Sequence, residues 1–172
     1  MRLYTIGHST RSLMELVEAL KAYGVSNLID VRTVPKSRHT PQFNEDNMAI
    51  ELPKSGITYE HRKALGGLRY SPKGSINLGW HNTSFRGYAD YMQTPEFAQG
   101  LGKLLACARR RRVAIMCAEA VPWRCHRSLI ADALQVRRCK VEHIVSGKTC
   151  QEHTLTAWAK VQGTKITYPS EA

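Results

Sequence analysis

"RLYTIGHSTRSLMELVEALKAYGVSNLIDVR", residues 2–32, begins and ends with short apolar runs, "LYTI" and "NLIDV", of the kind that form buried β-strands. The residues between these runs place apolar side chains at helical spacing, at Leu13, Leu16, Val17 and Leu20. Ser12 and Glu15 have the spacing of a capping box, and Gly24 is a typical helix stop. The stretch therefore predicts a β-α-β unit whose parallel strands are joined by a right-handed crossover.

The rest of the chain repeats this alternation. We expect further strands at 57–61, 113–117 and 140–145, helices at 44–56, 94–110, 125–138 and 150–160, a helix beginning at 88–92, and a short extended segment at 165–168. With 172 residues and 42% apolar content, the chain suits one compact domain. The predicted fold is α/β, a single layered domain over 1–172 with a mainly parallel sheet of about five strands flanked by helices, and 147–172 forming a C-terminal helix and tail.

The net charge of +11 is concentrated in the second part of the chain. Residues 1–60 carry seven Lys and Arg against seven Asp and Glu, whereas residues 61–172 carry eighteen against seven. A basic surface favours polyanionic partners, either a phosphate-bearing small molecule or nucleic acid, although it also simply promotes solubility. The run Arg109–Arg112 closes a predicted helix, where arginines are first of all favourable partners of the helix dipole.

The five cysteines form no regular framework, which fits a reducing compartment and predicts no structural disulfide. No signal peptide and no membrane span are recognisable, so we expect a cytoplasmic protein with no membrane partner. No cofactor is predicted.

"SGKT" at 146–149 resembles a phosphate-binding loop, but Glu142 stands where the first glycine of that motif belongs. The oligomeric state stays open.

Ligands of parallel sheets gather beyond the carboxyl ends of the strands, and this rule brings distant residues together. His8 and Ser9 follow the first strand, Arg32 follows the second, and Cys117 and Glu119 lie at the end of the fourth. The irregular stretches 33–43 and 65–87 are long enough to be binding loops or flaps. Residues 69–88 contain a mixture of aromatic and basic residues, and the aromatic side chains either stack bases or, as we favour, anchor the loop to the core.

"CAEAVPWRCHR", residues 117–127, holds the residues with chemistry, and three interpretations are open. As a metal site it is poorly spaced, because Cys117, Cys125 and His126 read C-x7-C-H and the last two cannot easily converge on one tetrahedral ion, even with His8 as a fourth ligand. As a nucleophile, either cysteine would have its pKa lowered by a nearby helix N-terminus and by neighbouring cations. The spacing to Arg124 is C-x6-R instead of the C-x5-R of cysteine-dependent phosphatases. For Cys117 taken alone, we favour the interpretation as a small apolar residue at the end of a buried strand.

The third interpretation gives Glu119 the leading role. A carboxylate projecting from a strand end can act as general acid or base, with His8 or His126 as its proton partner. The alternative is an internal salt bridge with Arg124, Arg127 or Arg32 that locks the loop. Arginines that neutralise a carboxylate and arginines that bind a phosphate look the same in a sequence, so both interpretations stay open.

Several of these motifs occur together in one known family. The motifs are "TIGHST" opening a strand, "DVR" followed by "PKSR", "LGG" after the third strand, "YADYM" with a later Phe, and C-x-E-x-x-P-x-x-C-H-R followed by "VEHI". Their order resembles that of the bacterial and archaeal domain of unknown function 488. Residues 1–146 resemble this family. The resemblance implies a shared fold and a shared cleft at these positions, and it implies no particular reaction.

Together these observations predict an enzyme that binds a phosphate-bearing substrate, a nucleotide or nucleic acid, at the strand ends. Glu119 is the expected acid or base, with Cys117, Cys125, His126 and His8 as further catalytic candidates. The expected anion-binding residues are Ser9, Arg32, Arg38 and Arg127. The alternative is a non-catalytic nucleic-acid-binding module that uses the basic second half, and a remote third hypothesis is a zinc protein.

Overall fold

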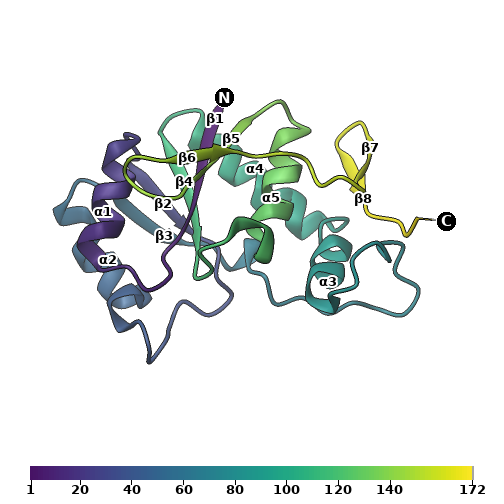
Figure 1. The fold of residues 1–172 in the computed structure, drawn as a ribbon, viewed down its shortest axis with the longest axis horizontal. Coiled ribbons are helices and arrows are strands. Elements are labelled where there is room, and N and C mark those ends of the chain that lie inside the picture. Colours follow the sequence, from purple (N-terminus) through teal and green to yellow (C-terminus); the bar gives the residue numbers. More distant parts are fainter. Residues whose placement is uncertain (172) are drawn as a thin grey trace.

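A six-stranded sheet forms the centre of the molecule, in the order β3-β2-β4-β1-β5-β6 (Figure 1). The structure is a computed structural model and describes residues 1–171. The first five strands are parallel, and β6 pairs antiparallel with β5 at one edge. The strands are β1 Arg2–Gly7, β2 Asn27–Asp30, β3 Thr58–His61, β4 Val113–Cys117, β5 Lys140–Ile144 and β6 Cys150–Glu152. The α-helices are α1 Leu13–Ala22, α2 Glu45–Lys54, α3 Thr83–Tyr91, α4 Pro95–Ala108 and α5 Arg127–Gln135.

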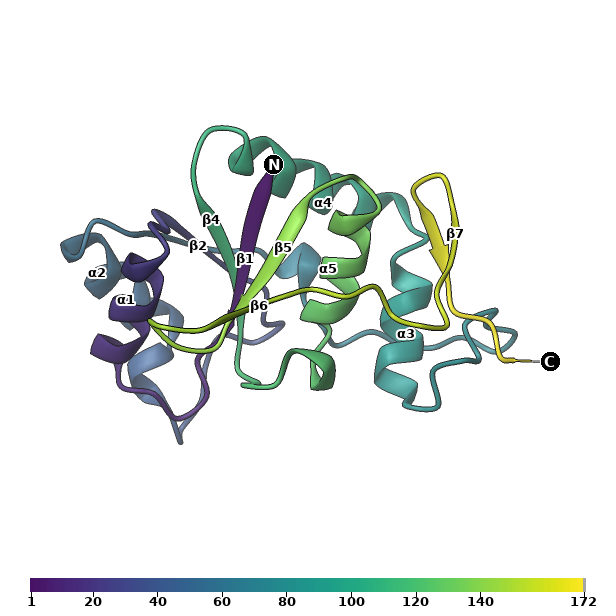
Figure 2. The same ribbon diagram turned by 45° about the horizontal axis from the view of Figure 1, so that its top comes forward.

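Helices cover both faces of this sheet, α1 and α2 on one side and α4 and α5 on the other (Figures 1 and 2). The strand side chains alternate between the two layers. Val113, Ile115 and Cys117 of β4 join the core beneath α4 and α5, whereas Ala114 and Met116 join the core beneath α1 and α2. The predicted α/β class with a mainly parallel sheet is therefore confirmed. None of the helices described is long and apolar enough to cross a membrane.

The first β-α-β unit forms as its sequence predicts. The Ser12 hydroxyl accepts a hydrogen bond from the Glu15 amide, and the Glu15 carboxylate accepts one from the Ser12 amide, each at 3.1 Å. β4 lies between β1 and β2, with Gly7 opposite Cys117 and Asp30 opposite Met116. The residues that follow these three strands therefore meet at one edge of the sheet.

Two helix predictions need correction. Residues 150–160 are not a helix, because Cys150–Glu152 extends the sheet as β6 and pairs with Ile144–Glu142 of β5. After a loop, β7 Lys160–Gln162 and β8 Lys165–Thr167 form a separate hairpin, so the expected C-terminal helix and tail is a strand followed by a hairpin. α3 begins at Thr83, five residues before the expected start, because the Asn82 side chain caps the amides of Ser84 and Phe85.

The long stretch before α3 is fastened to the core. The Asp90 carboxylate of α3 accepts hydrogen bonds from Ser71, Ser75 and Asn77, and the side-chain oxygen of Asn77 accepts one from the Tyr168 amide. The Trp80 ring packs on Trp158, Phe85 and Tyr168, with centroids 4.9, 5.0 and 5.5 Å apart. Aromatic anchoring is thus confirmed for Trp80. Tyr70 departs from it, because 83% of the residue is exposed.

Candidate active site at the strand ends

A cleft of about 490 Å³ opens at the carboxyl ends of β2 and β4. Its walls come from segments far apart in the chain: Arg32, Thr33 and Val34 after β2, Cys117–Glu119 at the end of β4, Arg124–His126 before α5, Gly67 and Leu68 of the long loop, and Asn82, Ser84 and Phe85 at the start of α3. The sequence predicted a cleft at this edge. It left the 65–87 stretch as either a binding loop or a flap, and part of that stretch lines the cleft.

Two glycines allow the walls to approach closely. A Cβ on Gly7 would lie 1.8 Å from the carbonyl oxygen of Glu119, so the end of β1 and the 118–120 loop touch only because residue 7 has no side chain. A Cβ on Gly67 would lie 2.6 Å from Nδ1 of His126. The "TIGHST" and "LGG" motifs therefore have a steric function beside the cleft.

Two cysteines contact each other in the wall of the cleft. The Sγ atoms of Cys117 and Cys125 lie 2.7 Å apart, and both residues are buried apart from this face. The Arg127 amide, at the start of α5, donates a hydrogen bond to Cys125 Sγ at 3.4 Å. Nδ1 of His126 lies 3.5 Å from the same sulfur. A negative charge on Cys125 is thus met by a thiol, a helix N-terminus and an imidazole.

The hydrogen bond on the far side of the His126 ring determines its tautomer. Nε2 lies 2.9 Å from the carbonyl oxygen of Val31, which can only accept, so Nε2 carries a proton. Nδ1 therefore faces Cys125 either as the acceptor of the thiol proton or, once protonated, as the donor to a thiolate. A base oriented by a third group beside a cysteine is the arrangement of cysteine nucleophiles.

The two thiols differ in acidity. Burial raises the pKa of Cys117 well above its ordinary value, and the adjacent Cys125 raises it further. Burial alone would also raise the pKa of Cys125. The hydrogen bond from Cys117 and the proximity of His126 and Arg127 outweigh burial and hold the pKa of Cys125 well below its usual range. The pair therefore carries its thiolate on Cys125.

Glu119 projects its carboxylate at the exposed rim of the cleft. Its Oε1 accepts a hydrogen bond from the Val121 amide at 3.3 Å. Its backbone carbonyl faces inward and accepts from Nη2 of Arg127 at 2.7 Å. No ion pair joins Glu119 to an arginine within residues 1–171, so the carboxylate is not the internal lock that the sequence left open.

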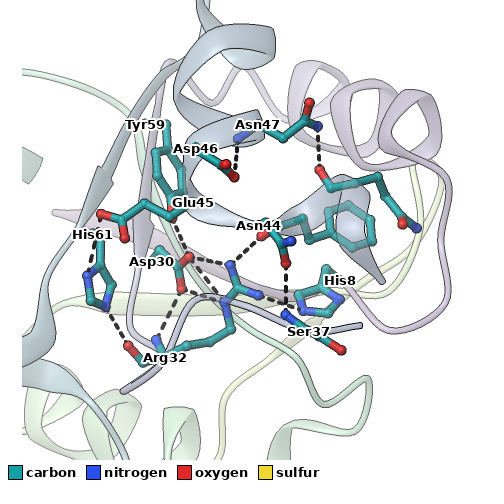
Figure 3. A network of polar contacts seen from close by, with 12 residues as sticks. His8, Asp30, Arg32, Ser37, Asn44, Glu45, Asp46, Asn47, Tyr59 and His61 are labelled. Atoms are coloured by element: carbon teal, nitrogen blue, oxygen red, sulfur yellow. Dashed lines mark hydrogen bonds and ion pairs between the residues drawn. The ribbon is translucent and has the colours of Figure 1, made fainter. Parts of the chain in front are cut away.

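Arg32, in the cleft wall, and His8 belong to one buried polar network (Figure 3). The Asp30 carboxylate accepts from Nε and Nη2 of Arg32 at 2.9 and 2.6 Å and from the Tyr59 hydroxyl at 2.6 Å. Nη1 of Arg32 lies 3.3 Å from Nε2 of His8, whose Nδ1 donates to the Ser9 carbonyl. Burial lowers the pKa of His8, so His8 is a neutral acceptor for the arginine.

The remaining anion-binding candidates lie in different surroundings. The guanidinium of Arg127 is fully buried, where Nη1 donates to the Thr5 hydroxyl and Nη2 to the Glu119 carbonyl. It therefore lies beneath the thiol pair as a fixed positive charge and does not line the cleft. Arg38 is exposed on the 33–43 loop outside the cleft walls. Ser9 adopts a positive φ of 48° at the end of β1, where its amide donates to Ala118.

A buried chain of hydrogen bonds that the sequence analysis did not identify begins at Arg127. Nη1 of Arg127 donates to Thr5, and Oγ1 of Thr5 lies 2.6 Å from Nδ1 of His143. Nε2 of His143 lies 2.9 Å from Nδ1 of His153, and Nε2 of His153 donates to the Asp132 carboxylate at 2.7 Å. Asp132 also accepts from Tyr168. With both imidazoles neutral, every donor in the chain points from the buried cation toward the buried carboxylate. The signal in the sequence was a charged residue, Asp132, amid the apolar side chains of a predicted helix.

Acidification should destabilise the fold through this chain. Burial, with the nearby His153 and Arg127, lowers the pKa of His143 from 6.5 to about 3. Between pH 6.5 and about pH 3, His143 is protonated in the unfolded state and neutral in the folded state. The folded state is therefore destabilised as the pH drops below 6.5, by up to about 1.4 kcal/mol per pH unit. We expect the free energy of unfolding, measured with urea between pH 6 and pH 4, to depend less steeply on pH in His143→Gln than in the wild-type protein. The difference in slope should correspond to the uptake of up to one proton. Equal slopes in both proteins would contradict the prediction.

The zinc hypothesis receives no support from the described part of the chain. Within residues 1–171, no three His, Cys, Asp or Glu side chains are grouped closely enough to hold a metal ion. Cys117, Cys125 and His126 instead contact one another through hydrogen bonds, in which the thiol of Cys117 and the imidazole of His126 both face the Cys125 sulfur.

Comparison with known proteins decides the family. The model of the family described as domain of unknown function DUF488 matches residues 12–134. The chain belongs to the DUF488 family. No curated protein and no solved structure matches it. The DUF488 match extends from α1 through α5 and includes Cys117, Glu119 and Cys125, whereas His8, His143 and His153 lie outside the matched residues. The expected family is confirmed, over a shorter range than the resemblance across 1–146 suggested.

Proposed function

We propose that the chain is an enzyme that acts on a phosphate-bearing substrate, a nucleotide or nucleic acid, in the strand-end cleft. Cys125 is the nucleophile and Glu119 the acid or base. The observation that carries the proposal is the Cys125–His126 pair at the start of α5, with the Arg127 amide 3.4 Å from the sulfur and the pair open to the cleft. A cysteine whose pKa is held low inside a cleft wall is a candidate nucleophile, because burial by itself favours the neutral thiol.

The proposed reaction has two steps. The Cys125 thiolate attacks the electrophilic centre of the substrate, a bond from sulfur forms, and the bond to the leaving group breaks as Glu119 transfers a proton to it. Water then attacks the covalent intermediate, Glu119 recovers its proton from that water, and Cys125 leaves as thiolate. Glu119 suits both steps because its carboxylate stands at the exposed rim, where leaving group and water enter.

Positive groups around the cleft support a phosphate-bearing substrate. α3 and α5 both begin at the cleft, and the partial positive charge at a helix N-terminus favours anions. Arg124 lies exposed on the rim and Arg127 is buried beneath. Arg32 is held by Asp30 and contributes little net charge. We therefore assign phosphate contact to Arg124 first.

Alkylation of Cys125 tests the proposal without knowledge of the reaction. At pH 6.5 an ordinary thiol is only about 1% ionised, whereas the lowered pKa of Cys125 should make it the most ionised of the five cysteines and the first to react with iodoacetamide. Adenosine monophosphate, inorganic pyrophosphate or a short oligonucleotide should slow this reaction by occupying the cleft. Arg124→Gln should weaken the protection, while Arg111→Gln, on the opposite edge of the sheet, should leave it unchanged.

Turnover then separates enzyme from binder. Once a nucleoside phosphate is found to be consumed, Cys125→Ser and Glu119→Gln should each abolish turnover while binding persists. Uniform alkylation of all five cysteines, with no protection by any phosphate compound, would refute the proposal.

One observation favours the second candidate, a nucleic-acid-binding module. Arg109–Arg112 and Arg138 are all exposed, and they precede β4 and β5, so they lie at the amino ends of the strands, opposite the cleft. Binding that falls steeply with salt, and that Arg109→Gln with Arg111→Gln weakens while Arg124→Gln does not, would place nucleic acid on that edge.

A further inference from the structure

Two of the chain's five cysteines, Cys117 and Cys125, are in contact with each other. The sulfurs lie 2.7 Å apart in the wall of the cleft. The other three are Cys107 in α4, where its sulfur accepts from Asn27, Cys139 before β5 and Cys150 in β6. The contact therefore singles out one dithiol.

The backbones of this dithiol are held from both sides. Cys117 lies in β4 between β1 and β2, and its carbonyl accepts from the His8 amide at 2.9 Å. The Cys125 amide donates to Pro122, and its carbonyl accepts from the amide and hydroxyl of Ser128. A disulfide requires the sulfurs to approach to about 2.05 Å, which is a small movement from 2.7 Å.

We propose that Cys117 and Cys125 form a redox-active dithiol that a hydroperoxide converts to a disulfide. The Cys125 thiolate attacks one peroxide oxygen, the O–O bond breaks, and the other oxygen leaves as water or an alcohol after taking a proton. Cys125 is then a sulfenic acid. The Cys117 sulfur attacks that sulfur, the S–S bond forms, and the hydroxyl group leaves as water with the Cys117 proton. Two thiols lose two electrons, and the hydroperoxide gains them.

The geometry assigns the two roles. Cys125 receives the Arg127 amide and faces Nδ1 of His126, so it is the sulfur that can hold negative charge and react first. Cys117 has its Sγ 3.6 Å from the Glu119 carbonyl and in contact with Cys125. This position suits a resolving thiol, which attacks Cys125 after Cys125 has been oxidised. This chemistry goes beyond the proposed enzyme and does not depend on its substrate. In that enzyme, oxidation would remove the nucleophile reversibly.

Oxidation of the reduced wild-type protein tests the proposal directly. With one equivalent of hydrogen peroxide, thiol titration of the denatured protein should show the loss of two of five thiols, and mass spectrometry should show a bond between the peptides of Cys117 and Cys125. Dithiothreitol should restore both thiols. Loss of thiols spread over Cys107, Cys139 and Cys150, or no loss, would overturn the proposal.

Variants test the order of the steps. Cys117→Ser should stop the reaction at a sulfenic acid on Cys125, which dimedone traps. Cys125→Ser should slow oxidation of the remaining thiols at least about tenfold, because the thiolate is the reacting species. Cys139→Ser is the matched control and should oxidise like wild type. Rapid oxidation of Cys125→Ser would refute the role of Cys125, and the wild-type peptide map still shows whether the disulfide forms if a variant fails to fold. Both proposals use the Cys125 thiolate, and alkylation at pH 6.5 separates them. Selective alkylation of Cys125 without formation of the disulfide would overturn the redox proposal alone, whereas uniform alkylation of the cysteines would count against both.

Discussion

Asp30→Ala should destabilise the protein by about 3–5 kcal/mol, because it leaves the buried guanidinium of Arg32 without its counter-charge. Asp30 is fully buried and accepts from two nitrogens of Arg32 and from the Tyr59 hydroxyl. Arg32 in turn donates to the Phe43 carbonyl at 2.6 Å and approaches His8. Removing one carboxylate therefore leaves several polar groups without a partner, and urea unfolding at pH 7 measures the loss.

A second carboxylate nearby provides the control. Glu60 of β3 pairs with Nε of Arg62 at 2.8 Å, but its side chain is 54% exposed. Glu60→Ala should cost at most about 1 kcal/mol, because water compensates an exposed pair. Adding Arg32→Met to Asp30→Ala should recover part of the loss, since no unpaired charge then stays buried. Equal small losses in Asp30→Ala and Glu60→Ala would show that the Asp30–Arg32 pair does not support the fold.

Much of the fold follows from side-chain periodicity, since each strand and helix buries a face. "VAIMC" predicts a strand buried on both faces, and all five residues are buried in β4. The prediction failed at residues 150–160, where the deciding contacts are distant. His153 bonds to Asp132 and His143, and Cys150 pairs with Ile144. A local pattern cannot report a partner that tertiary packing supplies.

Part of the candidate site could likewise be predicted from the sequence, and part of it depends on tertiary contacts. The strand-end rule predicted that His8, Ser9, Arg32, Cys117 and Glu119 would meet. Arg32, Cys117 and Glu119 do line one cleft, whereas His8 and Ser9 lie outside its walls. The sequence could not show which charges are already paired. Asp30 stands two residues before Arg32 in "DVR", yet only the structure shows that the two side chains bind each other. Likewise the burial of Arg127 depends on Thr5 and on the Glu119 carbonyl, which belong to other segments.

Gly7→Ala should disturb fold and site together, with a loss of about 3 kcal/mol or more. The added methyl would lie 1.8 Å from the Glu119 carbonyl oxygen and 2.9 Å from the Cα of Ala120, and backbone atoms cannot rotate away as a side chain can. Relief requires the 118–120 loop to move from β1, which breaks the bonds from the amides of His8 and Ser9 to residues 117 and 118. Urea unfolding measures this loss.

Gly102→Ala is the matched control and should have the opposite sign. Gly102 lies within α4, and no atom outside the neighbouring helix backbone lies within 4 Å of a Cβ placed there, so the change should stabilise the protein by about 0.5–1 kcal/mol through the higher helix propensity of alanine.

The two glycine substitutions should also differ in their effect on the reactivity of Cys125. Moving the Glu119 carbonyl removes an acceptor of Arg127, whose amide donates to Cys125, so Gly7→Ala should lose the selective alkylation of Cys125 at pH 6.5. Gly102→Ala should keep it. If Gly7→Ala folds with full stability and an unchanged Cys125, contact between β1 and the 118–120 loop does not position the nucleophile.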